Sequence, residues 1–404
     1  MTVAMSSLET ESAPDRPVES SQRPAAPQAR TATAGPPEAE AGGVLTVDLS
    51  AIEANWRALS RRTVPSECAA VIKGDAYGCG LEQVGRALTR AGCKTFFVAD
   101  LSEARRLRAV AYDPTIYVLN GVMPGTAAAF AEANVRPVIG SLAELAEWDA
   151  FVSAKAWQGG AALQVDTGMN RLGVTAEEAA AIAPRIRSEN HGITLLMSHL
   201  ACAQLQDHPL NERQIKLFRE IRMLYRGIPG SLSNSSGIFL GQSTYCDMVR
   251  PGAALFGVNP TPGRNNPMRP VVELKAKVAQ VRSVQRGETV GYDAQWTARR
   301  AGRLAIVPVG YADGYLRAAS ASDTVAGSEV IVAGKRCRLA GRISMDLLAI
   351  DIGELPESAV RRGDLVTLIG DEYTVDDLAA TAGTIGYEVL TSLGRRYHRI
   401  YRAE

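Results

Sequence analysis

The sequence predicts an α/β protein in which a (β/α)8, TIM-like barrel is followed by a mostly β domain. Two observations carry this prediction. From residue 44 onward, short apolar runs alternate with helical patterns at a repeat of about 25 residues, and eight of these runs are strand candidates. After about residue 270, strand-like runs joined by glycine-containing turns replace the helical patterns. A doubly wound sheet alternates in the same way but usually has fewer strands.

Residues 1–43 differ in composition from the rest of the chain. They hold six of the 20 prolines and no aromatic residue. Such a segment cannot bury enough apolar surface to offset its ordering entropy, so we expect a disordered tail. It also lacks the apolar core, of roughly 7–15 residues, that a secretory signal needs.

We expect the barrel over residues 44–270. Order begins at 44–47 (VLTV), and Ser50 with Glu53 forms a capping box for the helix that follows. Helical patterns, such as the one over 81–92, separate most of the strand candidates. These candidates are 68–72, 95–99, 115–119, 136–139, 161–166, 193–198, about 230–234 and 246–249.

The second domain is expected over residues 271–404. Its strand-like runs cover 271–284, 304–309, 329–351 and 364–369, and turns such as 286–288 (RGE) connect them. A short helix over 375–382 and a basic C-terminal strand close the chain.

Composition excludes several classes of protein. The 44 Lys and Arg nearly balance the 43 Asp and Glu, which argues against a nucleic-acid partner. No run approaches 18 consecutive apolar residues, so we expect no membrane span. Only four scattered His argue against a metal site. The six scattered Cys, with no CxxC pair, indicate a reduced, cytoplasmic protein.

Active-site residues of such a barrel lie at the carboxyl ends of its strands. The first strand candidate ends in Lys73, and a buried lysine with a lowered pKa suits a Schiff base. The fifth and eighth strands lead to Arg171 and Arg250, the sixth to His199, and the seventh to the turn 233–237 (SNSSG). Hydroxyl and backbone N–H donors in that turn suit a phosphate. Together these groups indicate pyridoxal 5′-phosphate, although a sugar-phosphate aldolase would use the same parts.

Five motifs closely resemble those of bacterial alanine racemases, which are fold type III pyridoxal-phosphate enzymes. They are 70–78 (AVIKGDAYG), 166–173 (DTGMNRLG), 249–252 (VRPG), 290–292 (VGY) and 341–346 (GRISMD), and their order and spacing agree over residues 44–404. The resemblance implies a cofactor-carrying barrel and a homodimer in which the partner's β domain completes each site. It also implies an isomerase that interconverts L- and D-alanine and supplies D-alanine for peptidoglycan.

The resemblance also assigns roles to single residues. Racemisation needs a base on each face of the substrate Cα, and Lys73, which also holds the cofactor, and Tyr292 match these two bases. Arg171 matches the residue that positions the substrate carboxylate, and the backbone N–H of Met345, beside Asp346, assists it. The other cofactor-binding positions are Tyr77, Ser235, Gly252 and Ala253 at the phosphate, Arg250 at the pyridine nitrogen, and His199 between Arg250 and Tyr292.

Two positions depart from the family's pattern. Gln164 stands where many relatives carry a lysine, often modified to a carbamate, beside the substrate-binding Arg171. A neutral amide can hydrogen-bond Arg171 but cannot neutralise it. The family's late tyrosine, a phosphate contact, has no clear counterpart, so either Arg395 or Tyr397 replaces it or the contact is absent.

Three other functions stay open at this point. A racemase of broader specificity, acting for example on serine, would differ only in its pocket walls. A barrel-fold decarboxylase of basic amino acids shares the lysine and the β domain, but it needs Gly-rich and acidic/Cys motifs that the sequence lacks. A non-catalytic pyridoxal-phosphate carrier is typically a single barrel, and the residues after 270 argue against it.

Overall fold

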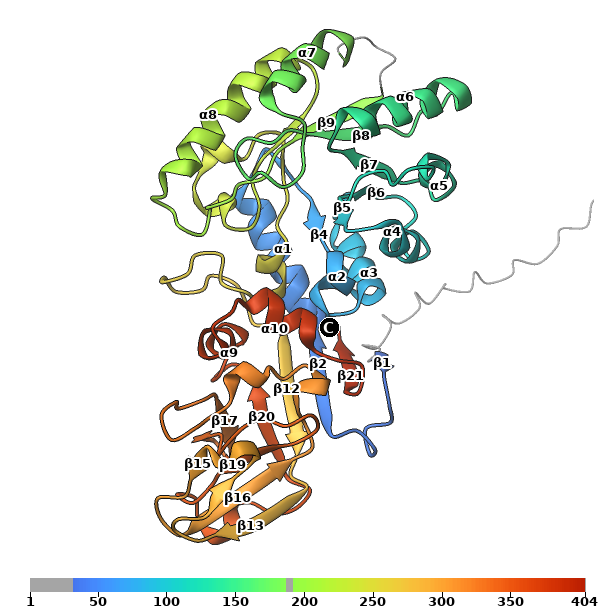
Figure 1. Cartoon of the computed structure of the whole chain (residues 1–404). Helices are drawn as coiled ribbons and strands as arrows, with labels where there is room; N and C mark the ends of the chain where they lie inside the picture. Colours follow the sequence, from blue (N-terminus) through green and yellow to red (C-terminus); the bar gives the residue numbers. More distant parts are fainter. Residues whose placement is uncertain (1–31, 187–191, 404) are drawn as a thin grey trace, which may run out of the picture.

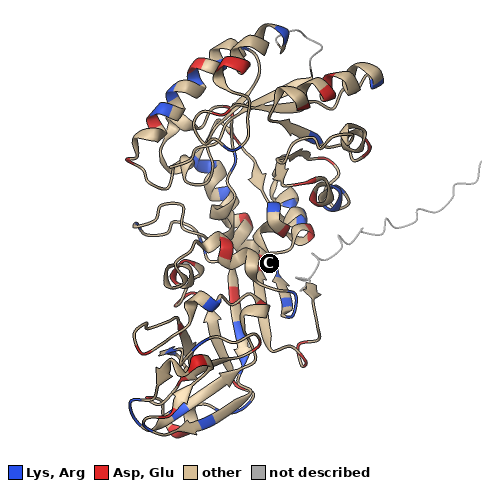
Figure 2. Cartoon of the chain, viewed as in Figure 1, with Lys and Arg blue, Asp and Glu red and all other residues tan. Residues whose placement is uncertain are grey.

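The computed structural model describes residues 32–186 and 192–403, so residues 1–31 of the tail expected over 1–43 lie outside the described residues. The chain forms two parts stacked end to end (Figure 1): a barrel with its surrounding helices, and a mostly β domain at the other end. Figure 2 shows that the Lys and Arg positions are interspersed with the Asp and Glu positions along the ribbon of both parts, as expected for a net charge of +1. Within the described residues, no helix is long and apolar enough to cross a membrane.

The barrel sheet is parallel throughout. Its strands follow one another around the ring in the order β3-β11-β10-β9-β8-β7-β6-β5-β4. Only Ala69 separates β3 from β4, so these two are halves of one strand and the sheet is nearly closed. This confirms the predicted barrel. The strands are β3 (Glu67–Cys68), β4 (Ala70–Val71), β5 (Thr95–Val98), β6 (Thr115–Val118), β7 (Arg136–Ile139), β8 (Ala161–Gln164), β9 (Ile193–Met197), β10 (Gly230–Ser231) and β11 (Met248–Val249).

Helices surround the barrel. They are α1 (Leu49–Arg62), α2 (Lys73–Tyr77), α3 (Leu81–Ala91), α4 (Leu101–Arg108), α5 (Ala127–Glu132), α6 (Leu142–Lys155), α7 (Ala176–Ile186) and α8 (Pro209–Leu224). In a regular (β/α)8 barrel a helix follows each strand, and the last two strands depart from that pattern. Short 3-10 helices follow them instead: η1 (Gly237–Phe239), η2 (Gln242–Thr244) and η3 (Ala253–Phe256).

The first helix begins earlier than the capping box at Ser50 and Glu53 predicts. Its N-cap is Asp48, whose carboxylate accepts a hydrogen bond of 2.8 Å from the backbone N–H of Ala51. A charged carboxylate at this place also interacts favourably with the positive end of the helix dipole.

Among the described residues, the second domain contains three sheets. The largest has the order β1-β21-β2-β12-β20-β17-β18, the next has the order β13-β16-β19, and β14 pairs with β15. The strands are β1 (Ala32–Ala34), β2 (Gly43–Asp48), β12 (Val272–Lys277), β13 (Gln280–Val284), β14 (Thr289–Val290), β15 (Trp296–Thr297), β16 (Gly302–Val307), β17 (Glu329–Val332), β18 (Lys335–Arg338), β19 (Leu348–Asp351), β20 (Leu365–Ile369) and β21 (His398–Arg402). Its helices are η4 (Tyr292–Ala294), η5 (Tyr311–Asp313), η6 (Arg317–Ala319), η7 (Glu357–Ala359), α9 (Val375–Ala382) and α10 (Gly386–Ser392).

The N-terminal segment belongs to the second domain rather than to the barrel or to a tail. Strand β2 pairs with β12 and β21, so it lies in the domain that otherwise begins near residue 271. Residues 32–34, which the prediction placed in the tail, form β1 and pair with β21. The main-chain partners of these strands come from the far end of the chain, and no local pattern reveals such pairing.

The barrel interior is a small apolar cluster that includes Phe97, Tyr117, Leu195 and Met197. A much larger cluster lies between the barrel and its helices and continues into the second domain. The continuous core fixes how the rim of the barrel faces the second domain.

Candidate active site

Five side chains converge at the rim formed by the carboxyl ends of the barrel strands. Lys73 follows β4, Arg171 lies in the loop after β8, His199 follows β9, Ser235 follows β10 and Arg250 follows β11. The positive charges of Arg250, Arg171 and Lys73 all act on the His199 ring. The structure therefore brings together the barrel positions that the sequence analysis singled out.

The backbone becomes left-handed directly after Lys73. The φ angles are 55° at Asp75, 56° at Ala76 and 53° at Tyr77. For residues other than glycine, this conformation costs about 1–2 kcal/mol each. The turn therefore persists only because neighbouring groups hold it.

A cradle of polar groups lies beside this turn. The Ser235 hydroxyl accepts hydrogen bonds from the backbone N–H groups of Gly252 (2.9 Å) and Ala254 (3.2 Å). A Cβ added at Gly252 would lie 2.3 Å from the Tyr77 hydroxyl oxygen, so only glycine leaves room for it. The Tyr77 ring stacks on Phe256 with centroids 4.8 Å apart.

The cradle suits a phosphate group. Burial raises the pKa of Tyr77, so its hydroxyl keeps the proton and can donate. The Ser235 hydroxyl and the chain at Gly252 and Ala253 stand next to it. Neutral donors that converge at the start of a short helix are the usual surroundings of a bound phosphate.

Tyr387 is a residue of this region that the sequence analysis missed. It comes from α10, its ring lies edge-on to Tyr77 at 6.0 Å between centroids, and its hydroxyl accepts a 3.0 Å hydrogen bond from the amide of Gln204. By contrast, Arg395 is exposed, and the ring of Tyr397 is buried against Gly43. The tyrosine next to the cradle is therefore Tyr387, earlier in the C-terminal segment than the motif predicts.

The environment of Lys73 favours its neutral amine. Burial lowers the pKa of Lys73, and the charge of Arg171 lowers it further, while Glu103 opposes the shift. A neutral amine is the nucleophile that a Schiff base requires. Lys73 is thus prepared for the cofactor attachment that its motif implies.

Arg250 is kept charged, whereas the neighbouring His199 imidazole is kept neutral. Arg250 is buried and donates to the Ser231 hydroxyl (2.5 Å) and the Ser198 carbonyl (2.6 Å). Burial lowers its pKa to about 10, so the guanidinium stays charged near neutral pH. Burial, followed by the charges of Arg250, Arg171 and Lys73, lowers the pKa of His199 to about 3, so its ring stays neutral.

The side chain of Gln164 contacts the backbone of the loop that carries Arg171. The buried amide donates a 2.8 Å hydrogen bond to the carbonyl of Leu172, the residue after Arg171. Through this bond the amide reaches the backbone of the loop that carries Arg171. Two further bonds, from the N–H groups of Gly168 and Met169 to the Asp166 carboxylate, shape the same loop. The exposed Arg171 is therefore positioned by the backbone that carries it.

The remaining predicted residues lie in the second domain, away from the rim. Tyr292 and Met345 are exposed, with 67% and 53% of their surface accessible. Asp346 accepts a 2.8 Å bond from Arg396, which also pairs with the buried Asp313 at 2.7 Å. Figure 1 shows β15, the strand just after η4, far down the second domain from α2. One chain by itself does not bring Tyr292 to Lys73.

Together, a parallel barrel with a lysine at the end of its first strand, a phosphate cradle between its last strands and a β domain define a barrel-type pyridoxal-phosphate enzyme. Two family models match the chain: the alanine racemase N-terminal domain over residues 47–260 and the alanine racemase C-terminal domain over 271–401. The chain belongs to the alanine racemase family, whose members are pyridoxal-phosphate-dependent isomerases.

Curated relatives and solved structures agree with this assignment. An alanine racemase of Methylobacterium nodulans is 52% identical over 360 residues, covering 89% of this chain and 96% of that protein. A catabolic alanine racemase of Mesorhizobium japonicum is 47% identical, covering 92% and 97%. A biosynthetic one of Agrobacterium fabrum is 42% identical, covering 88% and 93%. The crystal structure of the Bartonella henselae alanine racemase with covalently bound pyridoxal phosphate superposes with a TM-score of 0.84 at 36% identity, covering 89% and 99%.

Proposed function

We propose that this protein interconverts L- and D-alanine, with Lys73 and Tyr292 as the two proton-transfer bases. The observation that carries the proposal is the position of Lys73: its amine, with a lowered pKa, stands on the rim beside the Ser235–Gly252–Tyr77 cradle. The cofactor, when bound, withdraws electrons from the substrate Cα and so makes its proton removable. The protein's own side chains and backbone must bind the cofactor, orient the substrate and transfer the proton.

Each rim residue has a separate task in this proposal. Lys73 attaches the cofactor and serves as the base on the D side, while Tyr77, Ser235, Gly252 and Ala253 hold the phosphate. Arg250 would face the pyridine nitrogen, and because its pKa, although lowered to about 10, is still well above neutral pH, it would donate a hydrogen bond without giving up its proton. Arg171 and the backbone N–H of Met345 orient the substrate carboxylate.

The proposal requires a second copy of the chain. Tyr292 and Met345 are exposed on the second domain, together with the apolar side chains of Tyr311 and Leu347. A homodimer arranged head to tail would place this surface over the partner's rim and bring Tyr292 to the partner's Lys73 and His199. Each active site would then be shared between two chains.

The physiological role belongs to the same proposal. We infer that the enzyme works in the cytoplasm and supplies D-alanine for peptidoglycan. The catabolic name of the 47% identical relative favours a second candidate role, the breakdown of one alanine enantiomer. Growth of a D-alanine auxotroph that carries this protein would support the supply role, and a failure to grow would favour the catabolic one.

A mixing experiment tests the two bases and the shared site together. Chiral chromatography should detect D-alanine formed from L-alanine by the wild type, and none by Lys73→Ala or Tyr292→Phe alone. Refolding the two variants together should restore about a quarter of the wild-type activity, because about half of the dimers then contain one intact site. Activity in Tyr292→Phe alone, or no recovery on mixing, would contradict the shared two-base site. Products from a panel of other L-amino acids would measure substrate breadth.

A further inference from the structure

We propose that Glu103 is a positioning residue: it clamps the left-handed turn after Lys73 and thereby sets the affinity of the chain for pyridoxal phosphate. The proposal rests on the proposed function only in taking Lys73 and Tyr77 as cofactor-binding groups. Neither the motifs nor the family resemblance assigned a role to Glu103.

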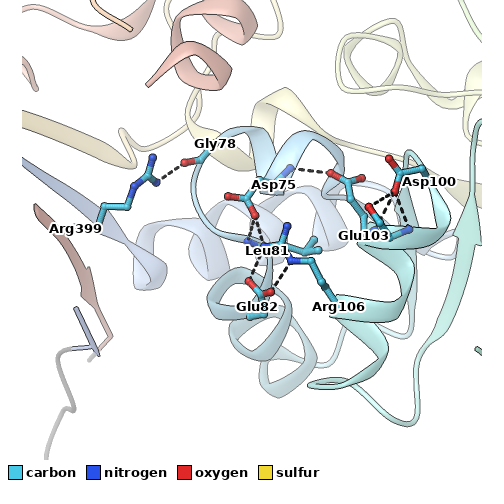
Figure 3. Close-up of polar contacts among 9 residues, drawn as sticks. Asp75, Gly78, Leu81, Glu82, Asp100, Glu103, Arg106 and Arg399 are labelled. Carbon is cyan, nitrogen blue, oxygen red and sulfur yellow. Dashed lines mark hydrogen bonds and ion pairs between the residues drawn. The ribbon is translucent and has the colours of Figure 1, made fainter. Parts of the chain in front are cut away.

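The two carboxylate oxygens of Glu103 hold two separate backbone segments. One oxygen accepts a 2.9 Å bond from the N–H of Asp75, within the turn, and the other accepts a 2.8 Å bond from the N–H of Ala99, just after β5. Only 8% of the Glu103 residue is exposed. Figure 3 shows its carboxylate beside the Asp75 segment. A buried carboxylate with two N–H donors makes hydrogen bonds about twice as strong as neutral ones.

The bond to Asp75 is not needed for capping helix α4. Asp100 already caps that helix by accepting bonds from the N–H groups of Ser102 and Glu103. The bond that the Glu103 carboxylate accepts from the Ala99 N–H completes the same helix start. The other oxygen reaches back 28 residues along the sequence to Asp75. Through its two bonds, Glu103 links the segment just after β5, a rigid part of the barrel, to the strained backbone of the turn.

A second set of contacts holds the outside of the turn. The Asp75 carboxylate accepts bonds from Arg106 (2.7 Å) and from the N–H of Leu81 (3.2 Å), and Arg106 also pairs with Glu82 (2.7 Å). The Arg106 and Asp75 side chains are 43% and 44% exposed, respectively. Exposed ion pairs contribute little, so this outer set provides matched controls for the buried clamp.

The clamp and the cofactor groups share one short segment. Lys73 directly precedes the run of positive φ angles, which extends from Gly74 to Gly78, and Tyr77 lies within it, so relaxing the turn would move the amine and the phenol relative to each other. Glu103 also lies close enough to Lys73 to oppose the lowering of its pKa. Two modes of action are therefore available to the carboxylate, a mechanical one and an electrostatic one, and we assign the mechanical one.

The test compares cofactor binding in matched variants. In Glu103→Gln the amide keeps one acceptor oxygen, but its NH2 group would face an N–H donor, so one of the two bonds is lost. Titration of the apo protein with pyridoxal phosphate, followed by visible absorbance, should give a dissociation constant raised about tenfold. Glu82→Gln, in the outer set, should change the dissociation constant less than about twofold. Glu103→Asp, which is too short to span both donors, should act in the same direction as Glu103→Gln.

A rescue variant separates the two modes of action. Glycine adopts a positive φ without steric cost, so Ala76→Gly relieves strain in the turn while leaving every charge in place. In the Glu103→Gln background it should restore most of the lost affinity, and it should slow hydrogen exchange at the Gly78 amide, which bonds to the Gly74 carbonyl at 2.8 Å. Wild-type affinity in both Glu103 variants would overturn the proposal. Weakened binding that Ala76→Gly does not restore would also overturn it, because the carboxylate would then act through its charge.

The proposed function fails separately from this inference. Borohydride reduction of the wild-type protein, followed by peptide mapping, should place the trapped cofactor on Lys73. Trapping at a different lysine would reject the proposed function itself, whatever the Glu103 variants do.

Discussion

Arg399 donates a 2.6 Å hydrogen bond to the carbonyl of Gly78, the residue that ends the turn after Lys73 (Figure 3). Arg399 lies on β21, the last strand of the second domain, whereas Gly78 belongs to the barrel. The C-terminal end of the chain thus supports the segment that carries the candidate cofactor lysine. The second domain therefore contributes to its own chain's site as well as to the site proposed for the partner.

Replacing Arg399 should destabilise the protein. The buried guanidinium also donates to the carbonyls of Leu393 (3.0 Å) and Gly394 (3.2 Å), so Arg399→Met would leave three acceptors without their donor. We expect the free energy of unfolding to fall by about 2–4 kcal/mol in urea titrations at fixed protein concentration. The exposed Arg395 provides the control, since Arg395→Met should cost less than about 0.5 kcal/mol. Equal losses in both variants would show that the bonds of Arg399 contribute nothing specific.

Gly252→Ala should weaken cofactor binding. The added Cβ would lie 2.3 Å from the Tyr77 hydroxyl oxygen, so the phenol must leave the cradle. We expect the dissociation constant for pyridoxal phosphate, measured by absorbance titration of the apo protein, to rise at least about tenfold. Gly302→Ala is a suitable control, because its Cβ would meet nothing closer than 3.7 Å. Unchanged binding in Gly252→Ala would mean that the cradle does not hold the phosphate.

Removing the amide of Gln164 should affect substrate binding more than turnover. Gln164→Ala leaves the Leu172 carbonyl without its 2.8 Å donor and loosens the loop that carries Arg171. We expect KM for L-alanine to rise about three- to tenfold with a smaller change in kcat, because the lost contact acts on ground-state and transition-state binding alike. The exposed Gln158 offers a comparison in which Gln158→Ala leaves both constants unchanged. A fall in kcat alone would contradict this role.

The stability of the apo protein should decrease on acidification because of His199. Its pKa is lowered to about 3 in the folded chain, against about 6.5 when unfolded, so below pH 6.5 the unfolded state binds a proton that the folded state does not. The free energy of unfolding should therefore fall, by at most about 1.4 kcal/mol per pH unit, as the pH decreases from about 6.5 toward 3. Subtracting the pH profile of His199→Gln isolates this slope from that of the carboxylates. A flat difference between the two profiles would refute it.

Several features of this protein follow from local sequence. Buried parallel strands are continuous apolar runs, and this is why the predicted strands at 95–99 and 115–119 match β5 and β6 closely. Active sites of such barrels lie at the carboxyl ends of the strands, and this predicts the site where Lys73, His199 and Arg250 lie. The comparisons confirm the family and its cofactor.

Other features depend on contacts between distant parts of the chain. No local pattern predicts a left-handed turn at Asp75, Ala76 and Tyr77, because each of these residues by itself prefers negative φ. From the sequence, Glu103 is only part of a helix start and Tyr387 only one residue of a late helix. Their contacts with Asp75 and Tyr77 form only in the folded chain.

By itself, the sequence determined which strands form the barrel and which residue types stand at its rim, since both depend on hydrophobic periodicity and on position within a strand. The tertiary structure alone decided that β2 joins the second domain and that Gln164 binds the Leu172 carbonyl. It also decided that Glu103 and Arg399 hold the turn after Lys73. The physical reason is that these are single hydrogen bonds and strand pairings between residues far apart in the chain, and only the packed core brings such partners within reach.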